Sequence, residues 1–360
     1  MKRLGPPAFL PVLLLAGCAT AELPVAVVDN PEYSVATGMR LLGRGQYGPA
    51  LAEFERARLL NEKHVPAYVG IALAKAHLGD AGGALAALDE ARRQNGIPVH
   101  AAAIGVLTLL RPPNWLEQAE REFETGRGKS ARDAELLLAM GRAYKVAFAF
   151  DRAAALLRQA LAVDQGQQEE AVQEIRALEM IQRAGPVSET GKRVALQGQV
   201  TRGELAALLV EEVGWLTLPE VARRPPEPAM AFAFAADLED SPYRGAVEAL
   251  LARPLRGLRL FPDQTFAPDQ AISREEFAVI LEDLLLRAKG DDLRAAPLAG
   301  TPSPFTDLPA QHFAFGAALL LARGGILERR PDGSFGPRES VAGPEALLAL
   351  RRLREVLRAP

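Results

Sequence analysis

Small and large apolar residues recur along the first half of the chain with a period of 34 or 35 residues. In each period a small residue is followed four positions later by a large apolar or aromatic residue, and then by another small one. Small residues let two helices cross closely, and the large side chain then fills the space between them. The recurring sets are Ala50, Phe54 and Ala57; Ala84, Leu88 and Ala91; Ala119, Phe123 and Gly126; and Ala153, Leu157 and Ala160.

This periodicity predicts four pairs of helices over residues 31–167. It resembles the tetratricopeptide repeat, a helix-turn-helix unit of 34 residues whose copies stack into a solenoid. The resemblance implies a groove that binds a protein partner, whose identity the helical pattern leaves open. The expected helices lie at about 31–45, 48–61, 66–78, 82–94, 99–110, 115–126, 133–146 and 150–163.

Two local features modify this repeat region. Pro112 and Pro113 break the turn inside the third repeat, which is one residue longer than the others. A further apolar-periodic stretch at 168–185 predicts a helix that caps or links the last repeat.

The second half of the chain, residues 186–360, carries a different internal similarity. The run FPDQTFAP at 261–268 is echoed by RPDGSFGP at 330–337, and a periodic helix opens eleven residues after each aspartate. Asp263 and Asp332 are turn residues by this pattern, and Phe266 and Phe335 are expected to be core anchors.

This unit of helix, Pro-Asp-x-x-Phe turn and helix resembles the S-layer homology motif, which usually occurs in threes and binds glycan of the bacterial cell wall. The resemblance implies a compact, mainly helical bundle of three copies. The first copy lacks the turn, and we expect the helix at 169–183 to serve as its first helix. The copies cover about 171–215, 237–286 and 305–356.

In copies 1 and 2 the second helix is preceded by a capping signal. Thr201 is followed three residues later by Glu204, and Ser273 by Glu276. In such a capping box the hydroxyl accepts from an early helix amide, while the glutamate accepts from the amide of the capping residue. We therefore expect these four residues to be helix caps.

Arg202 and Arg274 stand at the first helical position, where a cation opposes the helix dipole. A guanidinium beside free helix amides can form an anion site. In the S-layer homology family the matching arginine contacts an acidic or pyruvylated wall sugar, so the resemblance implies that both arginines bind glycan. The alternative is an ion pair with a carboxylate such as Glu275 or Asp269. The third copy has Gly343 in this place, and we expect it to keep the fold without the ligand.

The chain begins with two basic residues, a short apolar stretch at 4–15 and the sequence Leu-Ala-Gly-Cys ending at Cys18. This resembles the bacterial lipoprotein box, in which the cysteine is acylated and becomes the mature N-terminus. The resemblance implies a signal peptide at 1–17 and an acylated N-terminus with a spacer at 18–30. The alternative is a buried structural cysteine after an ordinary signal peptide. Ala19 fits sorting to the periplasmic face of the outer membrane, if the organism has one.

Composition and motif searches favour a non-enzymatic protein. Charged residues make up 24% of the chain and the net charge is −3, which does not indicate a nucleic-acid partner. The four histidines have no ligand spacing, and no carboxylate pair is singled out, so we expect no metal, cofactor or catalytic residue. The string Gly-Arg-Gly-Lys-Ser at 126–130 lacks the leading glycine of a phosphate-binding loop.

The sequence thus predicts an all-α envelope lipoprotein. Its lipid would enter a membrane, its repeat solenoid would bind a protein, and its C-terminal bundle would attach to peptidoglycan or a wall-linked polysaccharide. The alternative is an adaptor for assembly of a secretion, pilus or outer-membrane complex, with a structural, non-binding C-terminal region. A glycan-processing enzyme is a third interpretation, and it would need a carboxylate pair in a cleft.

Overall fold

A computed structural model describes residues 30–358 apart from 95–98, 164–167, 219–234 and 291–301. The predictions for Cys18 and the signal peptide lie outside the described residues. The chain divides into two compact units, residues 1–99 and 100–360. Within the described residues the fold is all-α, with a few isolated β-bridges and no named strand.

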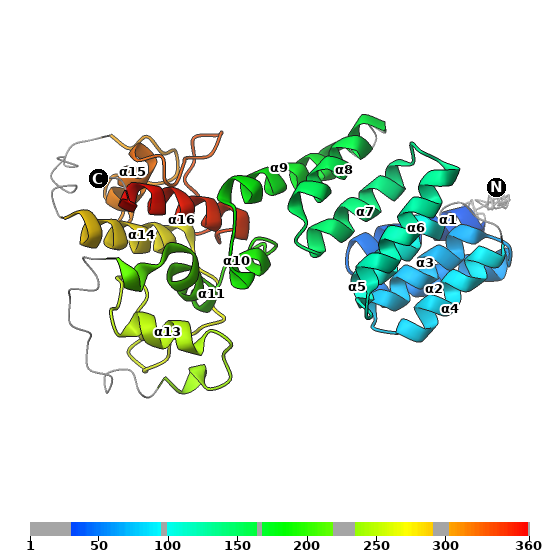
Figure 1. Ribbon diagram of the computed structural model, residues 1–360, viewed down its shortest axis with the longest axis horizontal. Helices are drawn as coiled ribbons and strands as arrows, with labels where there is room; N and C mark the ends of the chain where they lie inside the picture. Colours follow the sequence, from blue (N-terminus) through cyan, green and yellow to red (C-terminus); the bar gives the residue numbers. More distant parts are fainter. Residues whose placement is uncertain (1–29, 95–98, 164–167, 219–234, 291–301, 359–360) are drawn as a thin grey trace, which may run out of the picture. The chain divides into compact units, whose positions relative to one another are not determined.

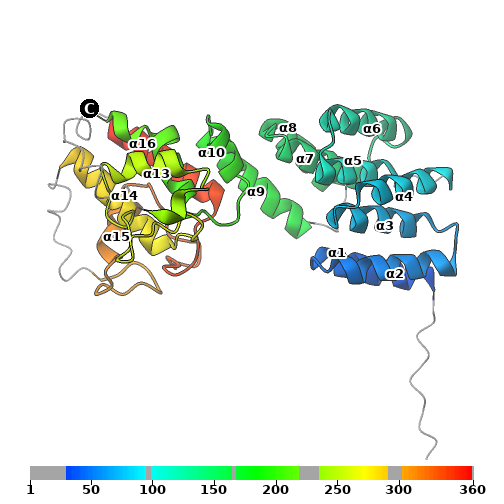
Figure 2. The same cartoon turned by 90° about the horizontal axis from the view of Figure 1, so that it is seen from below.

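The first unit contains two antiparallel helix pairs that stack on one another (Figure 2). Asn30 and Asp80 cap two of the helices, since their side chains accept from the amides of Tyr33 at 2.6 Å and Gly83 at 2.8 Å. These pairs confirm the first four predicted helices. They are α1 (Pro31–Gly43), α2 (Tyr47–Leu60), α3 (Val65–His77) and α4 (Ala81–Arg93).

Phe54 explains why small residues recur in this unit. Its ring is completely buried. A Cβ added to Gly38 would lie 2.6 Å from a ring carbon, and a Cβ added to Gly70 would lie 2.3 Å from another. One large side chain therefore fits between its own repeat and the next because both neighbours are glycine, as the predicted packing requires.

The second unit opens with two further helix pairs and a long helix, α9. α6 runs three residues beyond its predicted end, so Gly126–Lys129 of the phosphate-loop-like string are helical rather than part of a turn. α9 packs against α8 on one side and α16 on the other. The helices are α5 (Val99–Leu110), α6 (Trp115–Lys129), α7 (Ala134–Val146), α8 (Phe150–Val163) and α9 (Gln168–Ala184).

The C-terminal part of this unit is a cyclic bundle of three helix pairs (Figure 1). The second helix of each copy packs against the first helix of the next copy, and α16 closes the cycle on α10. The short helix α10, and not the predicted 169–183 helix, is therefore the first helix of copy 1. The pairs are α10 (Glu189–Val194) with α11 (Arg202–Leu208), α13 (Arg244–Leu251) with α14 (Arg274–Lys289), and α15 (Phe315–Arg323) with α16 (Gly343–Arg358).

A closed ring of backbone hydrogen bonds lies at the centre of the bundle. The amide of Val200 donates to Val341, that of Ile272 donates to Val200, and that of Val341 donates to Ile272, at 2.9, 2.9 and 3.2 Å. All three side chains are buried. The residues just before the three second helices are thus held together, which fixes where each helix begins.

Candidate functional site

The starts of α11 and α14 form the capping boxes that the sequence predicts. Thr201 Oγ1 accepts from the amide of Glu204 at 3.2 Å, and Glu204 Oε2 accepts from the amide of Thr201 at 2.9 Å. Ser273 and Glu276 make the same reciprocal pair at 3.3 and 2.9 Å. These bonds fix the direction of the arginine that follows each cap.

Arg202 is buried, with only 4% of its surface exposed. Its guanidinium donates to the carbonyl oxygens of Phe266, Gly257 and Arg259 at 2.8, 2.9 and 2.9 Å. It also lies 4.6 Å from the ring centre of Phe261 and 4.8 Å from that of Phe266. Burial lowers the pKa of Arg202, although the charges of nearby carboxylates oppose the shift.

Arg274 is buried in the same way at the next junction, with 2% exposed. It donates to the carbonyl of Glu328 at 2.6 Å, pairs with the carboxylate of Glu345, and lies over the ring of Phe335. Burial, with help from the positive charge of Arg330, lowers the pKa of Arg274 to about 10. Arg274 thus pairs with a carboxylate, as the alternative expects, although the partner is Glu345 and not Glu275 or Asp269. Arg202 is held by carbonyl oxygens instead.

Each arginine reaches into the loop of the following copy. The amide of Arg202 donates to Gln270 in copy 2, and that of Arg274 donates to Glu339 in copy 3, at 2.9 and 2.8 Å. The two arginines therefore serve two equivalent junctions and do not converge on one site. Their contact with a glycan stays a prediction, whereas their hold on the two loops is observed.

The third junction shows why copy 3 has no arginine. The amide of Gly343 donates to Gln197 in copy 1 at 2.9 Å, which is the equivalent docking contact. Copy 1 has no Pro-Asp-x-x-Phe loop for an arginine to hold. A Cβ at residue 343 would lie 1.7 Å from the carbonyl oxygen of Val194, so only glycine fits there without movement of the backbone.

Two aspartates that the motif pattern does not single out complete the loops. The carboxylate of Asp237 accepts from the amide of Phe266 at 3.0 Å, and also from the amide of the residue that follows it. Asp307 accepts from the amides of Phe335 at 2.6 Å and Gly336 at 2.8 Å. The sequence does contain a signal for these two aspartates, because residues 234–237 of copy 2 correspond to residues 304–307 of copy 3 and both stretches end in aspartate.

The Pro-Asp-x-x-Phe turns themselves form as expected. Asp263 accepts from the amide of Thr265 at 3.1 Å, and Asp332 accepts from the amide of Ser334 at 2.9 Å. Hydrogen bonds from the hydroxyl and the amide of Thr265 lower the pKa of Asp263, and those from the amide and the hydroxyl of Ser334 lower the pKa of Asp332. Phe266 and Phe335 are completely buried, which confirms them as core anchors.

In the part of the chain that the structure describes, no three His, Cys, Asp or Glu side chains gather in a way that could hold a metal ion. No helix in the same residues has both the length and the apolar character needed to cross a membrane.

Comparison with known proteins bears on the loop that Arg202 holds. The S-layer homology domain model matches residues 258–278, which include this loop and the capping box of α14. Over 100 residues the chain is 35% identical to Cell surface glycoprotein 1 of Acetivibrio thermocellus. That stretch is 28% of this chain and spans only 4% of the relative.

The chain also has a weaker resemblance to a solved structure. The crystal structure of a thermophilic TPR protein from Thermus thermophilus has a TM-score of 0.37 and 23% identity, and covers 50% of this chain and 91% of that one. This likeness is too slight to carry an argument. Residues 258–278 thus match the S-layer homology domain, and the helix pairs before them resemble the tetratricopeptide repeat.

Proposed function

We propose that the C-terminal bundle attaches this protein to the cell wall, either to peptidoglycan or to a wall-linked polysaccharide. The observation that carries this proposal is the S-layer homology match at 258–278. These residues include part of the loop that Arg202 holds and the second capping box. The location that follows is the cell envelope, and the role is attachment rather than catalysis.

The two arginines would support glycan binding without presenting their own charge. Their guanidinium groups are buried and hydrogen-bonded to loop carbonyls, so they fix the loops at junctions 1–2 and 2–3. Exposed groups beside these loops would then make the direct contact with sugar. A buried cation that holds loop carbonyls is a positioning residue in this proposal, in contrast to the sugar contact expected from the family resemblance.

Phe313 is the exposed group that we assign to this contact. Its ring is 68% exposed and lies 4.6 Å from the ring of His312. His312 Nε2 is in turn 3.5 Å from Glu275 Oε2, at the start of α14. A flat apolar ring beside an imidazole and a carboxylate offers a stacking face together with hydrogen-bonding groups, which suits a polyhydroxylated ligand.

The rest of the chain extends this proposal to a tether. Acylation of Cys18 would insert the N-terminus into a membrane, on the periplasmic face of the outer membrane if the organism has one. The helix pairs would bind a protein partner, as stacked helical repeats offer extended surfaces for this purpose. The protein would then link a membrane, a protein and the wall.

Co-sedimentation of the full chain with purified cell-wall sacculi tests the attachment. Phe313→Ser is expected to weaken binding at least fivefold. Leu59→Ser is the matched control, since Leu59 is 73% exposed and lies in the first unit. Equal binding by the wild type and Phe313→Ser would remove Phe313 from the contact, and no sedimentation of the wild type would contradict wall attachment.

A further inference from the structure

The first helix of the first unit, α1, has an exposed face that is apolar in the middle and charged at both ends. Together with α2, this helix forms one end layer of the unit (Figure 2). Tyr33 and Met39 are 51% and 46% exposed, and Ala36 between them is exposed as well. Side chains three positions apart share one side of a helix, so these three residues form a continuous stripe. The buried residues of α1, Ser34 and Gly38, lie on the opposite side.

Glu32 and Arg40 extend this stripe at its two ends, and both are exposed. Glu32 Oε1 lies 3.9 Å from His64 Nδ1, but 69% of the Glu32 side chain is exposed and can accept a further donor. Arg40 has no hydrogen bond or ion pair within the described residues. None of the residues three and four positions from Arg40 is acidic, since they are Ala36, Thr37, Gly43 and Arg44.

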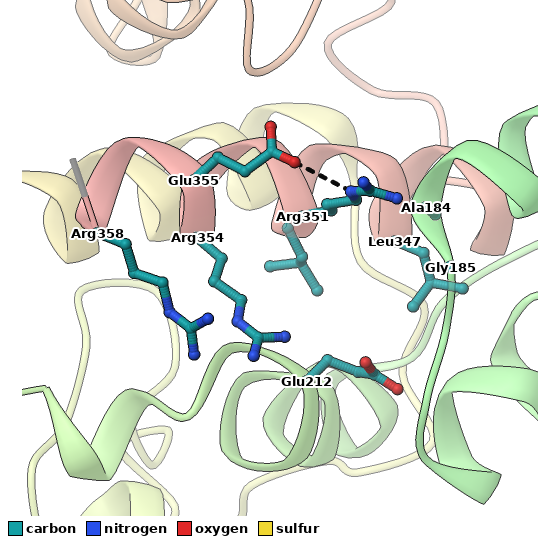
Figure 3. Close-up of a pocket in the computed structure, with 9 residues that line it drawn as sticks. Ala184, Gly185, Glu212, Leu347, Arg351, Arg354, Glu355 and Arg358 are labelled. Atoms are coloured by element: carbon teal, nitrogen blue, oxygen red, sulfur yellow. Dashed lines mark hydrogen bonds and ion pairs between the residues drawn. The ribbon is translucent and has the colours of Figure 1, made fainter.

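Another exposed arginine shows how such a charge is usually satisfied. On α16, the Nε of Arg351 donates to Glu355, one turn along the same helix, at 3.0 Å (Figure 3). Glu32 and Arg40 cannot pair in this way, because eight residues separate them by about 12 Å along the helix axis. The face of α1 therefore presents a carboxylate and a guanidinium that a second helix can complement.

We propose that this face of α1 is a dimer interface, on which the same face of a second copy of this chain packs in antiparallel orientation. A two-fold axis through Ala36 brings each residue level with the one that is equally far from Ala36 in the other direction. Glu32 is then level with Arg40 of the partner subunit, and Tyr33 with Met39 of the partner subunit. By symmetry each of these contacts occurs twice.

The chemistry of the two ends of the stripe is complementary in this orientation. The carboxylate of Glu32 meets a guanidinium, and the ring of Tyr33 meets a thioether and the same guanidinium. Ala36 at the axis has a small side chain, which lets the two backbones approach closely. In the parallel orientation Glu32 would be level with Glu32 of the partner subunit, so repulsion between like charges selects the antiparallel one.

The proposed interface consists of a single helix face on each copy, which is small for a specific complex. We therefore expect a reversible dimer that is weaker than one with an interface of standard size. Sedimentation equilibrium of the full chain with Cys18→Ser, which removes the proposed lipid, tests this association. The average mass is expected to rise with protein concentration from that of one chain toward that of two. A mass of one chain at every concentration, or growth beyond two chains, would overturn the proposal.

Exchange of the two charges tests the place and the orientation of the contact. Glu32→Arg and Arg40→Glu are each expected to weaken the dimer at least fivefold, because each substitution places like charges level with one another. The double variant restores opposite charges and is expected to dimerise at least threefold more tightly than either single variant. Glu117→Arg is the matched control, since Glu117 is exposed in the first turn of α6 just as Glu32 is in α1. Equal dimerisation by all four variants, or no rescue in the double variant, would refute the assignment.

Disulfide cross-linking tests the two-fold axis without altering the charges. Ala36→Cys, in the chain with Cys18→Ser, is expected to form a covalent dimer on mild oxidation, because residue 36 faces its equivalent across the axis. Leu85→Cys in the same background is the control, since Leu85 is 46% exposed but lies on α4. Cross-linking of both variants to the same extent would contradict the proposal.

The same cysteine variant distinguishes a second copy from the chain's own residues before Asn30 as the occupant of this face. A maleimide is expected to label Ala36→Cys in dilute monomer, and labelling is expected to fall as the dimer forms. Protection of the thiol in the monomer would show that the chain covers its own α1, and would overturn the proposal. None of these measurements involves sacculi, so the dimer interface and wall attachment can fail independently.

Discussion

Gly343→Ala is the substitution that most sharply tests how the three copies interlock. The added Cβ would lie 1.7 Å from the carbonyl oxygen of Val194, 2.7 Å from its carbonyl carbon and 3.1 Å from the carbonyl oxygen of Gln197. These are backbone atoms, which cannot rotate away as the end of a side chain can. The start of α16 must therefore move away from copy 1.

The cost follows from three contributions. Overpacking of a buried site typically costs about 1–3 kcal/mol. Loss of the hydrogen bond from Gly343 to Gln197 adds about 1 kcal/mol. The higher helix propensity of alanine offsets at most about 1 kcal/mol of this cost. We expect the free energy of unfolding to fall by about 1–4 kcal/mol, with a decrease in Tm of about 2–16 °C.

Urea denaturation followed by tryptophan fluorescence measures this change in the free energy of unfolding for the second unit. Both tryptophans, Trp115 and Trp215, lie in the second unit. Gly245→Ala in α13 is the matched control, because a Cβ there meets no atom within 4 Å. The control is expected to change stability by less than about 1 kcal/mol. Equal effects of the two substitutions would refute the interlock.

Four further results are expected. Arg202→Ala should lower the free energy of unfolding by about 3–5 kcal/mol, because three loop carbonyls lose their donor; a loss below about 1 kcal/mol in urea denaturation would contradict this role. Asp237→Asn should cost about 1–2 kcal/mol in the same assay, because loop amides lose a charged acceptor, and an unchanged midpoint would argue against it. Burial raises the pKa of Glu174, but hydrogen bonding and charge from Lys145 and a nearby arginine outweigh it, so the pKa is lowered. The stabilisation by the Glu174 carboxylate is therefore present above its unfolded pKa and is lost as the pH falls through its folded pKa. The destabilisation by Glu174→Gln should be full at about pH 7 and should shrink below about pH 4. A difference that does not depend on pH would exclude a contribution from the ion pair with Lys145. Cys18→Ser should move the protein from the membrane fraction to the soluble fraction, and retention in the membrane would refute the lipid anchor.

The helix pairs could be predicted from the sequence because their packing depends on the spacing of small and large residues within each helix. A small residue, a large residue such as Phe54 and another small residue recur at fixed intervals along each helix. α10 could not be predicted in the same way. It has six residues, which is too short to show a helical period, and its place in the bundle was assigned to the longer helix at 169–183.

The role of the arginines could be predicted only in part. Their unusual position at a helix start is visible in the sequence, but their acceptors are not. The carbonyls that hold Arg202 lie 55 to 64 residues away along the chain, and a backbone carbonyl leaves no signal in the amino acid that carries it. The absence of an arginine at Gly343 is likewise explained only by the nearness of Val194.

Binding of the full chain to purified sacculi, measured over a range of protein concentrations, is the most direct test of wall attachment. We expect saturable binding that is competed by soluble wall fragments. Sedimentation of the same fraction of protein with and without sacculi would contradict it.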